Sequence, residues 1–474
     1  MSIKKFFATE DTTITDAYKY DNTNRATTSN MGASDSLEVF FLSGAVSQTS
    51  LERSRILIKF PIDEISSSRA EGKIPVSGNV NFFLNLYNVK HPLTLPKNYY
   101  LRLAPVSASW QEGYGLDMES YTDIGATGSS GVGANWLWAA SNVTWSVQGG
   151  DFLNSYNYQY YIKNGDEDVK LDITALVEAQ VANSLPNYGL GVMMSGAYES
   201  SASAQSFYTK KFSARGTEFF FKRPSIEARW DSSNFDDRSN FFKESNVLSQ
   251  ADNTNYLYMY NRVKGSPKNI NGNPSLTVKF YSDAAAQNQL SASYLSTENP
   301  ATGTYKASVV LNTTASVVYD YWVNASATGT IYFSSSFEVL QRDVVDYNYE
   351  PAYVFSISNL KTSYKKDENT RFKIYSREKD WSPNVYAVAQ YVPENVLHKN
   401  LYYRIFRIVD GLTILDYGTG SIPYTLTSHD KNGNYFDLDM NILEPDYSYG
   451  VKLMLLENAN MKEQKEVFKF KVES

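Results

Sequence analysis

Hydrophobic and polar residues alternate along short stretches throughout the 474-residue chain. In residues 55–60, Ile56, Ile58 and Phe60 fall on one face of a strand, and the residues between them, Leu57 included, fall on the other. The same period of two recurs in residues 80–86, 226–230 and 468–472. Strands with one apolar and one polar face are typical of antiparallel sheets that pack in sandwiches. The pattern therefore predicts an all-β protein.

One segment departs from this period. Apolar residues from Ile173 to Val181 recur at helical spacing. The side-chain oxygen of Asp172 or Thr174 can accept an unpaired backbone N–H at the start of this segment, and Pro186 follows its end. We predict one short helix of about three turns inside an otherwise β domain.

Two polar stretches suggest domain boundaries. Residues 231–240 (DSSNFDDRSN) follow a strand that ends at Trp230, and residues 347–351 (YNYEP) follow a strand near residues 337–340. The predicted architecture is a jelly-roll-like β-sandwich followed by two immunoglobulin-like β-sandwiches. Their predicted bounds are residues 1–231, 232–346 and 347–474. The last two segments have roughly the ~100 residues of an immunoglobulin-like module.

Charge and cysteine content narrow the function classes. The chain has 44 basic and 51 acidic residues, a net charge of −7, and no long basic run. This balance argues against binding to nucleic acid or to an anionic membrane, which both need clustered Lys and Arg. No stretch approaches ~18 consecutive apolar residues, so we expect no spanning helix. The absence of cysteine excludes disulfides and thiolate sites and fits synthesis in a reducing cytoplasm.

Four stretches in the first half of the chain match one known family in order. They are residues 53–60 (RSRILIKF), 110–113 with 144–145 (WQEG, TW), 171–177 with 187–190 (LDITALV, NYGL), and 215–218 with 223–227 (RGTE, RPSIE). Together they resemble the DNRLRE, or disaggregatase-related, family. The resemblance implies a sandwich with a short helix, and some members of the family are linked to carbohydrate binding. The family's helix carries a Trp near its end, where this chain has residues 178–181 (EAQV).

The whole chain also resembles virion structural proteins of contractile-tailed marine cyanophages. The likeness is carried by residues 7–15 (FATEDTTIT), 29–35 (SNMGASD) and 221–231 (FKRPSIEARWD). It implies a protein that is assembled into the virion in the host cytoplasm, in multiple copies or as a homo-oligomer. Its partners would be other virion proteins. The resemblance does not specify head, neck or tail.

Catalytic groups are sparse. The three histidines, His91, His398 and His429, fall in different predicted loops, and no G-x-S-x-G elbow is present. A glycosidase needs two carboxylates across a cleft. Glu112, with Asp117 and Glu119 nearby, is a candidate for this role, but a polar loop beside core tryptophans explains these residues as well. We therefore expect no enzyme.

Two sets of residues are candidates for binding. Trp136 and Trp138 lie beside a glycine-rich loop at residues 125–133, which could present them to a host surface glycan. The alternative is that these tryptophans are core residues. Asp166, Glu167 and Asp168 could supply oxygen ligands to Ca²⁺, or could form a solvated turn. We predict no other cofactor.

Exposed tyrosines are the remaining candidates for protein interfaces. Tyr256, Tyr258 and Tyr260 alternate with Leu257 and Met259, so one of the two sets must be core. The sequence therefore predicts a virion structural protein that acts through protein–protein contacts as a decoration, fibre, collar or tail-accessory subunit. The alternative is a surface carbohydrate-binding protein.

Overall fold

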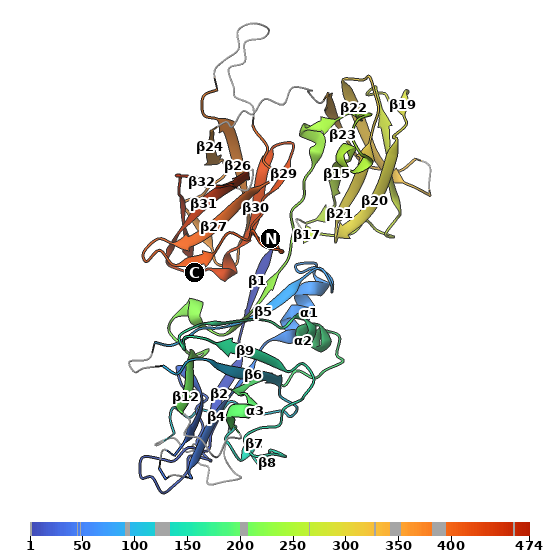
Figure 1. Ribbon diagram of the computed structural model, residues 1–474. Coiled ribbons are helices and arrows are strands. Elements are labelled where there is room, and N and C mark those ends of the chain that lie inside the picture. Colours follow the sequence, from blue (N-terminus) through green and yellow to red (C-terminus); the bar gives the residue numbers. More distant parts are fainter. Residues whose placement is uncertain are drawn as a thin grey trace. The chain divides into compact units, whose positions relative to one another are not determined.

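A computed structural model (Figure 1) describes residues 2–44, 46–47, 49–90, 95–118, 133–199, 207–264, 266–326, 329–341, 352–381, 395–457 and 460–474. Strands account for 46% of the chain and helices for 8%, which confirms the all-β prediction. The chain divides into two compact units. The first unit is Ile3–Arg229, and the second is Trp230–Ser474 together with Met1–Ser2. The predicted boundary near residue 347 lies outside the described residues.

The first unit is built on two antiparallel sheets. The four-stranded sheet has the order β1 (Ile3–Phe7), β13 (Ser225–Arg229), β5 (Asn81–Leu86) and β10 (Val169–Asp172). The seven-stranded sheet has the order β12 (Phe207–Ser213), β3 (Ser36–Ser43), β4 (Leu51–Lys59), β11 (Leu190–Met194), β6 (Tyr99–Pro105) and β9 (Tyr158–Ile162), with β2 (Glu10–Thr15) paired to β4. A small hairpin of β7 (Trp138–Ala140) and β8 (Val143–Thr144) lies apart from both sheets.

Strand β4 shows how the predicted alternation is realised and where it is incomplete. Ile56 and Ile58 are buried, as the period of two predicts. Leu57, which we placed on the polar face, is also 0% exposed. An inserted segment covers that face and forms a second cluster, the tryptophan core, made of Ile14, Leu57, Val106, Trp110, Ala134, Trp136, Ala139 and Trp145.

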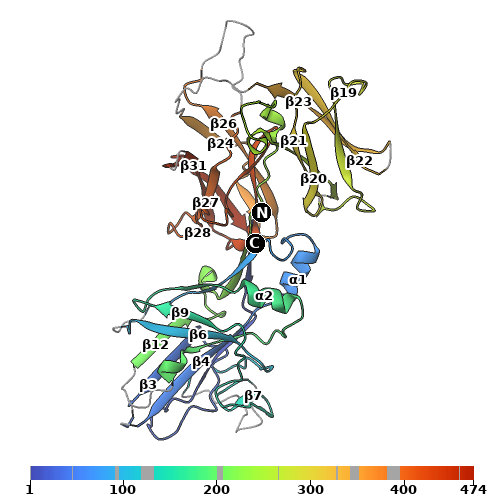
Figure 2. The ribbon, with the colours of Figure 1, turned by 45° about the vertical axis from the view of Figure 1, so that its right-hand side comes forward.

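Two helices lie side by side in the first unit (Figures 1 and 2). The predicted helix is α2 (Thr174–Val181), and Asp172 Oδ1 accepts the Thr174 N–H at its start over 2.9 Å. The second helix, α1 (Ile62–Ala70), was not predicted; it follows Pro61 and carries acidic residues in its first turn. Arg69 joins the two helices by a bidentate ion pair with Glu178, over 2.6 and 2.8 Å. The other helical segments among the described residues of this unit are α3 (Gly196–Glu199) and a 3₁₀ turn at Phe220–Lys222.

The second unit contains two sandwiches. In the middle sandwich, the larger sheet has the order β14 (Phe241–Phe242), β23 (Ile331–Leu340), β22 (Val317–Asn324), β18 (Leu276–Tyr281) and β19 (Gln289–Leu290). The smaller sheet has the order β15 (Asn255–Tyr260), β21 (Thr304–Val310) and β20 (Tyr294–Ala301). Short elements complete it: a 3₁₀ turn at Asp237–Ser239, α4 (Gln250–Asn253), and the paired strands β16 (Arg262–Val263) and β17 (Ser266–Pro267).

The last sandwich has two facing sheets. One has the order β24 (Tyr353–Ile357), β26 (Asn369–Glu378), β30 (Gly433–Asp439) and β29 (Ser428–Asp430). The other has the order β25 (Ser363–Lys365), β33 (Phe468–Glu473), β31 (Ser448–Glu457), β27 (Leu401–Arg407) and β28 (Thr413–Leu415), with β32 (Asn460–Glu463) paired to β31. A 3₁₀ turn spans Met440–Ile442.

The burial of residues in β15 shows which of its two alternating side-chain sets lies in the core. Leu257 and Met259 are 0% and 3% exposed and pack with Trp322 in the core of the middle sandwich. Tyr256 is half-buried, and Tyr260 is 36% exposed. Tyr258 is nevertheless buried, so the tyrosine set is not a continuous exposed surface.

Candidate functional site

The segment that leaves the first unit binds to the last sandwich. We call residues 232–239 the strap. The Asp236 N–H donates to the His429 carbonyl over 3.1 Å, and the His429 N–H donates to the Asn234 carbonyl over 3.0 Å. Phe235 and His429 thereby form a parallel bridge. The polar stretch that we predicted to mark a domain boundary thus pairs with β29 at an isolated bridge, and His429 is a strand residue rather than a loop residue.

Arg238 of the strap enters the middle sandwich. Its guanidinium donates to Asp236 Oδ2 over 2.5 Å, to Asp320 Oδ2 over 2.6 Å and to the Tyr258 carbonyl over 2.8 Å. The side chains of Arg238 and Asp320 are 4% and 0% exposed. Burial raises the pKa of Asp236 to about 6, although the Arg238 cation opposes this shift. Such a buried network is stable only while every charge keeps its partner.

Asp237 contacts the last sandwich from the same strap. Its Oδ1 lies 3.9 Å from His429 Nε2 and 3.2 Å from Lys399 Nζ, and its Oδ2 accepts the Tyr256 N–H over 2.8 Å. Burial acts to raise the pKa of Asp237, but His429, Lys399 and the Tyr256 N–H outweigh it, so the net shift is downward. The His429 ring is 1% exposed, so it is closed to a substrate. The charged residues of the strap, Asp236, Asp237 and Arg238, therefore bind both sandwiches.

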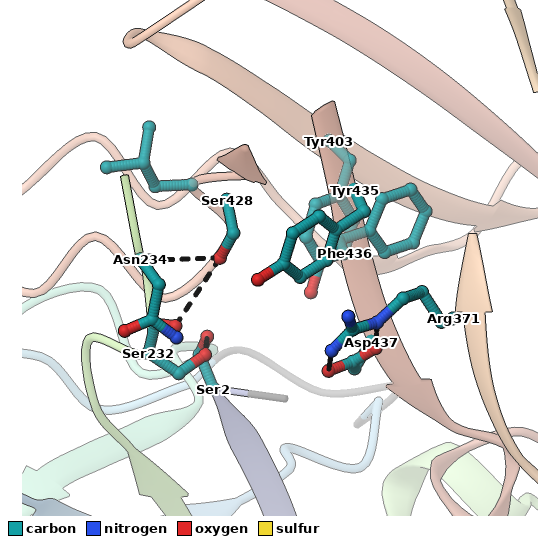
Figure 3. Close-up of a pocket in the computed structure, with 10 residues that line it drawn as sticks. Ser2, Ser232, Asn234, Arg371, Tyr403, Ser428, Tyr435, Phe436 and Asp437 are labelled. Carbon is teal, nitrogen blue, oxygen red and sulfur yellow. Dashed lines mark hydrogen bonds and ion pairs between the residues drawn. The ribbon is translucent and has the colours of Figure 1, made fainter. Parts of the chain in front are cut away.

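A small polar cavity lies where the strap meets β26 and β30 (Figure 3). Arg371 donates to both carboxylate oxygens of Asp437, over 2.7 and 2.9 Å, and its guanidinium lies 3.9 Å from the centre of the Tyr435 ring. On the strap side, the Asn234 N–H donates to Ser428 Oγ over 3.0 Å. The cavity volume is about 30 Å³, which holds about one water molecule and is far below the ~300 Å³ of a small-molecule site. This cavity belongs to a packed joint.

Tyrosines that the sequence analysis did not single out form an exposed surface on the first unit. Tyr100 of β6 and Tyr161 of β9 are cross-strand partners, 41% and 45% exposed, with ring centres 4.9 Å apart. Arg102 and Gln159 form the next pair on the same side. We call these four residues the tyrosine face. The Tyr161 hydroxyl donates to Asn98 Oδ1 over 2.6 Å, which holds its ring in place.

Two asparagine side chains hold the Arg102 guanidinium of the tyrosine face. Arg102 donates to Asn157 Oδ1 over 2.9 Å and to Asn154 Oδ1 over 3.2 Å. Exposed rings beside amide and guanidinium groups can stack on one face of a ligand and hydrogen-bond its hydroxyls. The tyrosine-rich sequences of these two strands, YYLRLAP and YQYYI, were the available signal, but they do not reveal which face is covered.

Trp136 and Trp138 have different environments. Trp136 is 2% exposed, and the guanidinium groups of Arg53 and Arg55 lie 5.1 and 5.2 Å from its ring centre. A ring buried in the tryptophan core has no face for a sugar, so the sugar-binding hypothesis for Trp136 is not supported. Trp138 is half-buried at the start of β7 and keeps this hypothesis open. Most of the glycine-rich loop at residues 125–133 lies outside the described residues.

The acidic stretch at residues 166–168 is bound to its own loop. Glu167 accepts the N–H groups of Lys163, Asn164 and Gly165, and Asp168 accepts the N–H of Asn88 over 2.7 Å. Asp166 is exposed. Within the described ranges, no three acidic or histidine side chains converge on a point where a metal could bind. The alternative of a turn therefore fits better than the predicted Ca²⁺ site.

A buried lysine lies beneath this turn. The ammonium of Lys210 is 2% exposed and donates to Asn88 Oδ1 over 2.7 Å and to the Gly165 carbonyl over 2.8 Å. Burial lowers its pKa to about 8, although the nearby carboxylates, Glu167 first, act in the opposite direction. The loop is thus held by a cation from the protein itself.

Glu112 is committed to a structural ion pair. Its carboxylate accepts two N–H groups of the Arg215 guanidinium over 2.5 Å each, and Oε1 also accepts the Asp11 N–H over 2.8 Å. Burial raises the pKa of Asp11 to about 7, against the opposing Arg215 N–H. Asp11 is 1% exposed, which leaves it inaccessible to a substrate. Asp117 is exposed, and Glu119 lies outside the described residues.

His398 contacts a serine hydroxyl rather than any of these carboxylates. His398 is 5% exposed, and its Nε2 lies 2.7 Å from Ser376 Oγ. Burial lowers its pKa to about 4, with a smaller effect of His429 in the same direction. His91 lies outside the described residues. Among the helices that the structure describes, none has the length and apolar character to cross a membrane.

Comparisons with known proteins give no family. No protein-family model matches the chain, and no curated protein matches it. Solved structures with partial similarity include the adhesin InvE of Yersinia pseudotuberculosis, at 12% identity over 48% of this chain and 56% of that chain. A marsupial T cell receptor aligns at 10% identity over 49% and 70% of the two chains, and titin at 11% over 50% and 95%. The TM-score is 0.15 in each case, too low to bear on function.

Proposed function

We propose that this protein is a non-catalytic structural component of a bacteriophage particle, which acts by binding neighbouring protein subunits. The observation that carries the proposal is the strap. Its backbone extends the last sandwich at β29, while its Arg238 is buried between Asp236 and Asp320. A joint fixed by backbone pairing and buried charge resists separation of the two sandwiches, as a protein that transmits force requires.

Two further observations support this role. The carboxylates of the half-buried Glu112 and the buried Asp11 are paired inside the fold. The resemblance of residues 7–15, 29–35 and 221–231 to cyanophage virion proteins points to the same class.

The test is the composition of the particle. Particles of the phage that encodes this chain would be purified on a density gradient and digested for mass spectrometry, and intact particles would be labelled with a gold-conjugated antibody. We expect the protein to band with infectious particles in a fixed copy number and to be labelled at one location. Recovery of the protein only from the soluble lysate would contradict the proposal.

Glycan binding is the second candidate function, favoured by the tyrosine face. Two exposed rings with a neighbouring Arg102 supply stacking surface and hydrogen-bond donors together. A glycan array probed with the full chain tests this. Tyr100→Ala/Tyr161→Ala should abolish any signal, while Tyr20→Ala, which removes a tyrosine that is 92% exposed on the same unit, should retain it. An array without signal for the unaltered protein removes this candidate.

A further inference from the structure

One sheet of the last sandwich gathers basic side chains that are far apart in the sequence. In β33, Phe470 and Val472 point into the core, at 2% and 0% exposed, and Lys469 and Lys471 alternate with them on the exposed side. Lys471 pairs with Ser448 of β31 and with Ser363 of β25, so its direct neighbours are uncharged.

The neighbouring positions on this side continue the pattern. Lys469 pairs with Gly450, over which the ring of Phe406 lies: a Cβ atom on Gly450 would come within 2.6 Å of it. One step further along β31, Lys452 stands directly opposite Arg404 of β27. We call Lys365, Arg404, Lys452, Lys469 and Lys471 the basic face.

The charges of the basic face are only partly neutralised. Glu463 pairs with Lys452 and lies 3.8 Å from Arg404, while Glu473 is the cross-strand partner of Lys365. Five cations thus face two carboxylates, a local positive surplus on a chain whose net charge is −7. Within the part of the chain that the structure describes, Lys469 and Lys471 have no ion-pair partner.

Ordinary structural reasons do not account for this arrangement. Like charges on opposite positions of neighbouring strands destabilise a sheet, and Arg404 and Lys452, which stand opposite each other, share the single carboxylate of Glu463. Lysines protect sheet edges from unwanted pairing, but Lys471 lies where β33 pairs with both β25 and β31; Lys469 precedes the residues that pair with β25. An anionic partner would remove the repulsion, because its charge would replace the missing carboxylates.

We propose that the basic face docks an acidic protein segment, rich in Asp and Glu, on a neighbouring subunit. The proposal names a partner class for the structural role proposed above, and rests on that role for the identity of the partner. Nucleic acid fits less well, because a duplex presents one charge per ~1.7 Å along a length that extends beyond this face, where the acidic rest of the chain would repel it. The binding assay needs no phage particle, so the two proposals can fail separately.

The experiment measures binding of a fluorescently labelled poly-glutamate peptide to the full chain by anisotropy, at low and at physiological salt. Lys469→Glu/Lys471→Glu is compared with Lys373→Glu/Lys379→Glu, which alters two exposed lysines elsewhere on the same sandwich. Each exchange subtracts two charges, so both double variants go from −7 to −11. We expect the first variant to bind about tenfold more weakly and the second to stay within about twofold of the unaltered protein.

Three outcomes would overturn the proposal. The first is equal weakening in both double variants, which would show an effect of net charge alone. The second is tighter binding of single-stranded DNA than of the peptide in competition. The third is unchanged binding in Lys469→Gln/Lys471→Gln, which removes the two charges without adding carboxylates and guards against misfolding of the first variant. Circular dichroism of each variant verifies the fold.

Discussion

Replacing Arg238 with alanine should destabilise the middle sandwich severely. The change removes four hydrogen bonds and leaves Asp236 and Asp320 buried without their cation. Removing one partner of a buried ion pair costs ~3–5 kcal/mol, because the remaining charge is neither solvated nor paired. We expect a loss near the middle of this range at pH 8, where Asp236 is ionised.

The pH dependence distinguishes this mechanism from simple loss of packing. Burial already raises the pKa of Asp236 to about 6, above its ordinary value of 3.8, and loss of the guanidinium raises it further. A carboxyl with a raised folded-state pKa binds protons more tightly when folded, so its contribution to stability grows as the pH falls through that pKa. The penalty of Arg238→Ala should therefore be smaller at pH 5 than at pH 8.

Hydrogen exchange monitored by mass spectrometry measures this locally. Peptides from β15 and β22 report opening of the middle sandwich, and a loss of ~3 kcal/mol speeds their exchange by about 100-fold. Lys361→Ala, which breaks the exposed pair with Glu368 in the last sandwich, is the control and should leave these peptides unchanged. A penalty below ~1 kcal/mol at pH 8, or an equal penalty at both pH values, would refute the reasoning.

Three further predictions concern other buried sites. The folded-state pKa of Asp11 is about 7 against 3.8 ordinarily, so the first unit should gain up to ~4 kcal/mol as the pH falls from 8 toward 4, and Asp11→Asn should flatten this dependence in calorimetry. His398 has the opposite sign: its pKa falls from 6.5 to about 4, so the last sandwich should lose stability as the pH drops through this window, and His398→Gln should lose less in urea titrations at pH 7 and 4.5. Gly191→Ala should lower the melting temperature by several degrees, because its Cβ would come within 2.0 Å of Phe152, whereas Gly196→Ala, with nothing within 4 Å, should not.

The local sequence pattern predicted the strands well, but it did not predict which other segments pack on them. The period of two placed Ile56 and Ile58 in the core because strand geometry alone determines which residues share a face. It misplaced Leu57 because an insertion, joined to β4 only in three dimensions, covers the second face. The same coverage buries Trp136 and leaves Tyr100 exposed, and no feature of the neighbouring sequence encodes it.

The partners of charged residues were harder to predict from the sequence than the strands were. The stretch around Arg238 resembles a solvated linker, since charged residues are rarely buried unless paired. Its partner Asp320 lies 82 positions away, and neither residue indicates the pairing in the sequence. The acidic turn at residues 166–168 posed the converse difficulty: three adjacent carboxylates suggest a cation, but the N–H groups that bind Glu167 come from the same loop. The sequence likewise does not indicate the basic face, because only the strand order of the sheet brings its lysines together.

The parallel bridge between Phe235 and His429 has a consequence for the order of synthesis. Asn234 leaves the ribosome 194 residues before its partner Ser428, so the backbone edge of the strap stays open while most of the second unit is made. An interrupted product would retain that open edge, which recruits other chains and favours aggregation. Closure of this joint thus has to wait until β29 has been made, and a chain interrupted before Ser428 lacks the partner of its strap.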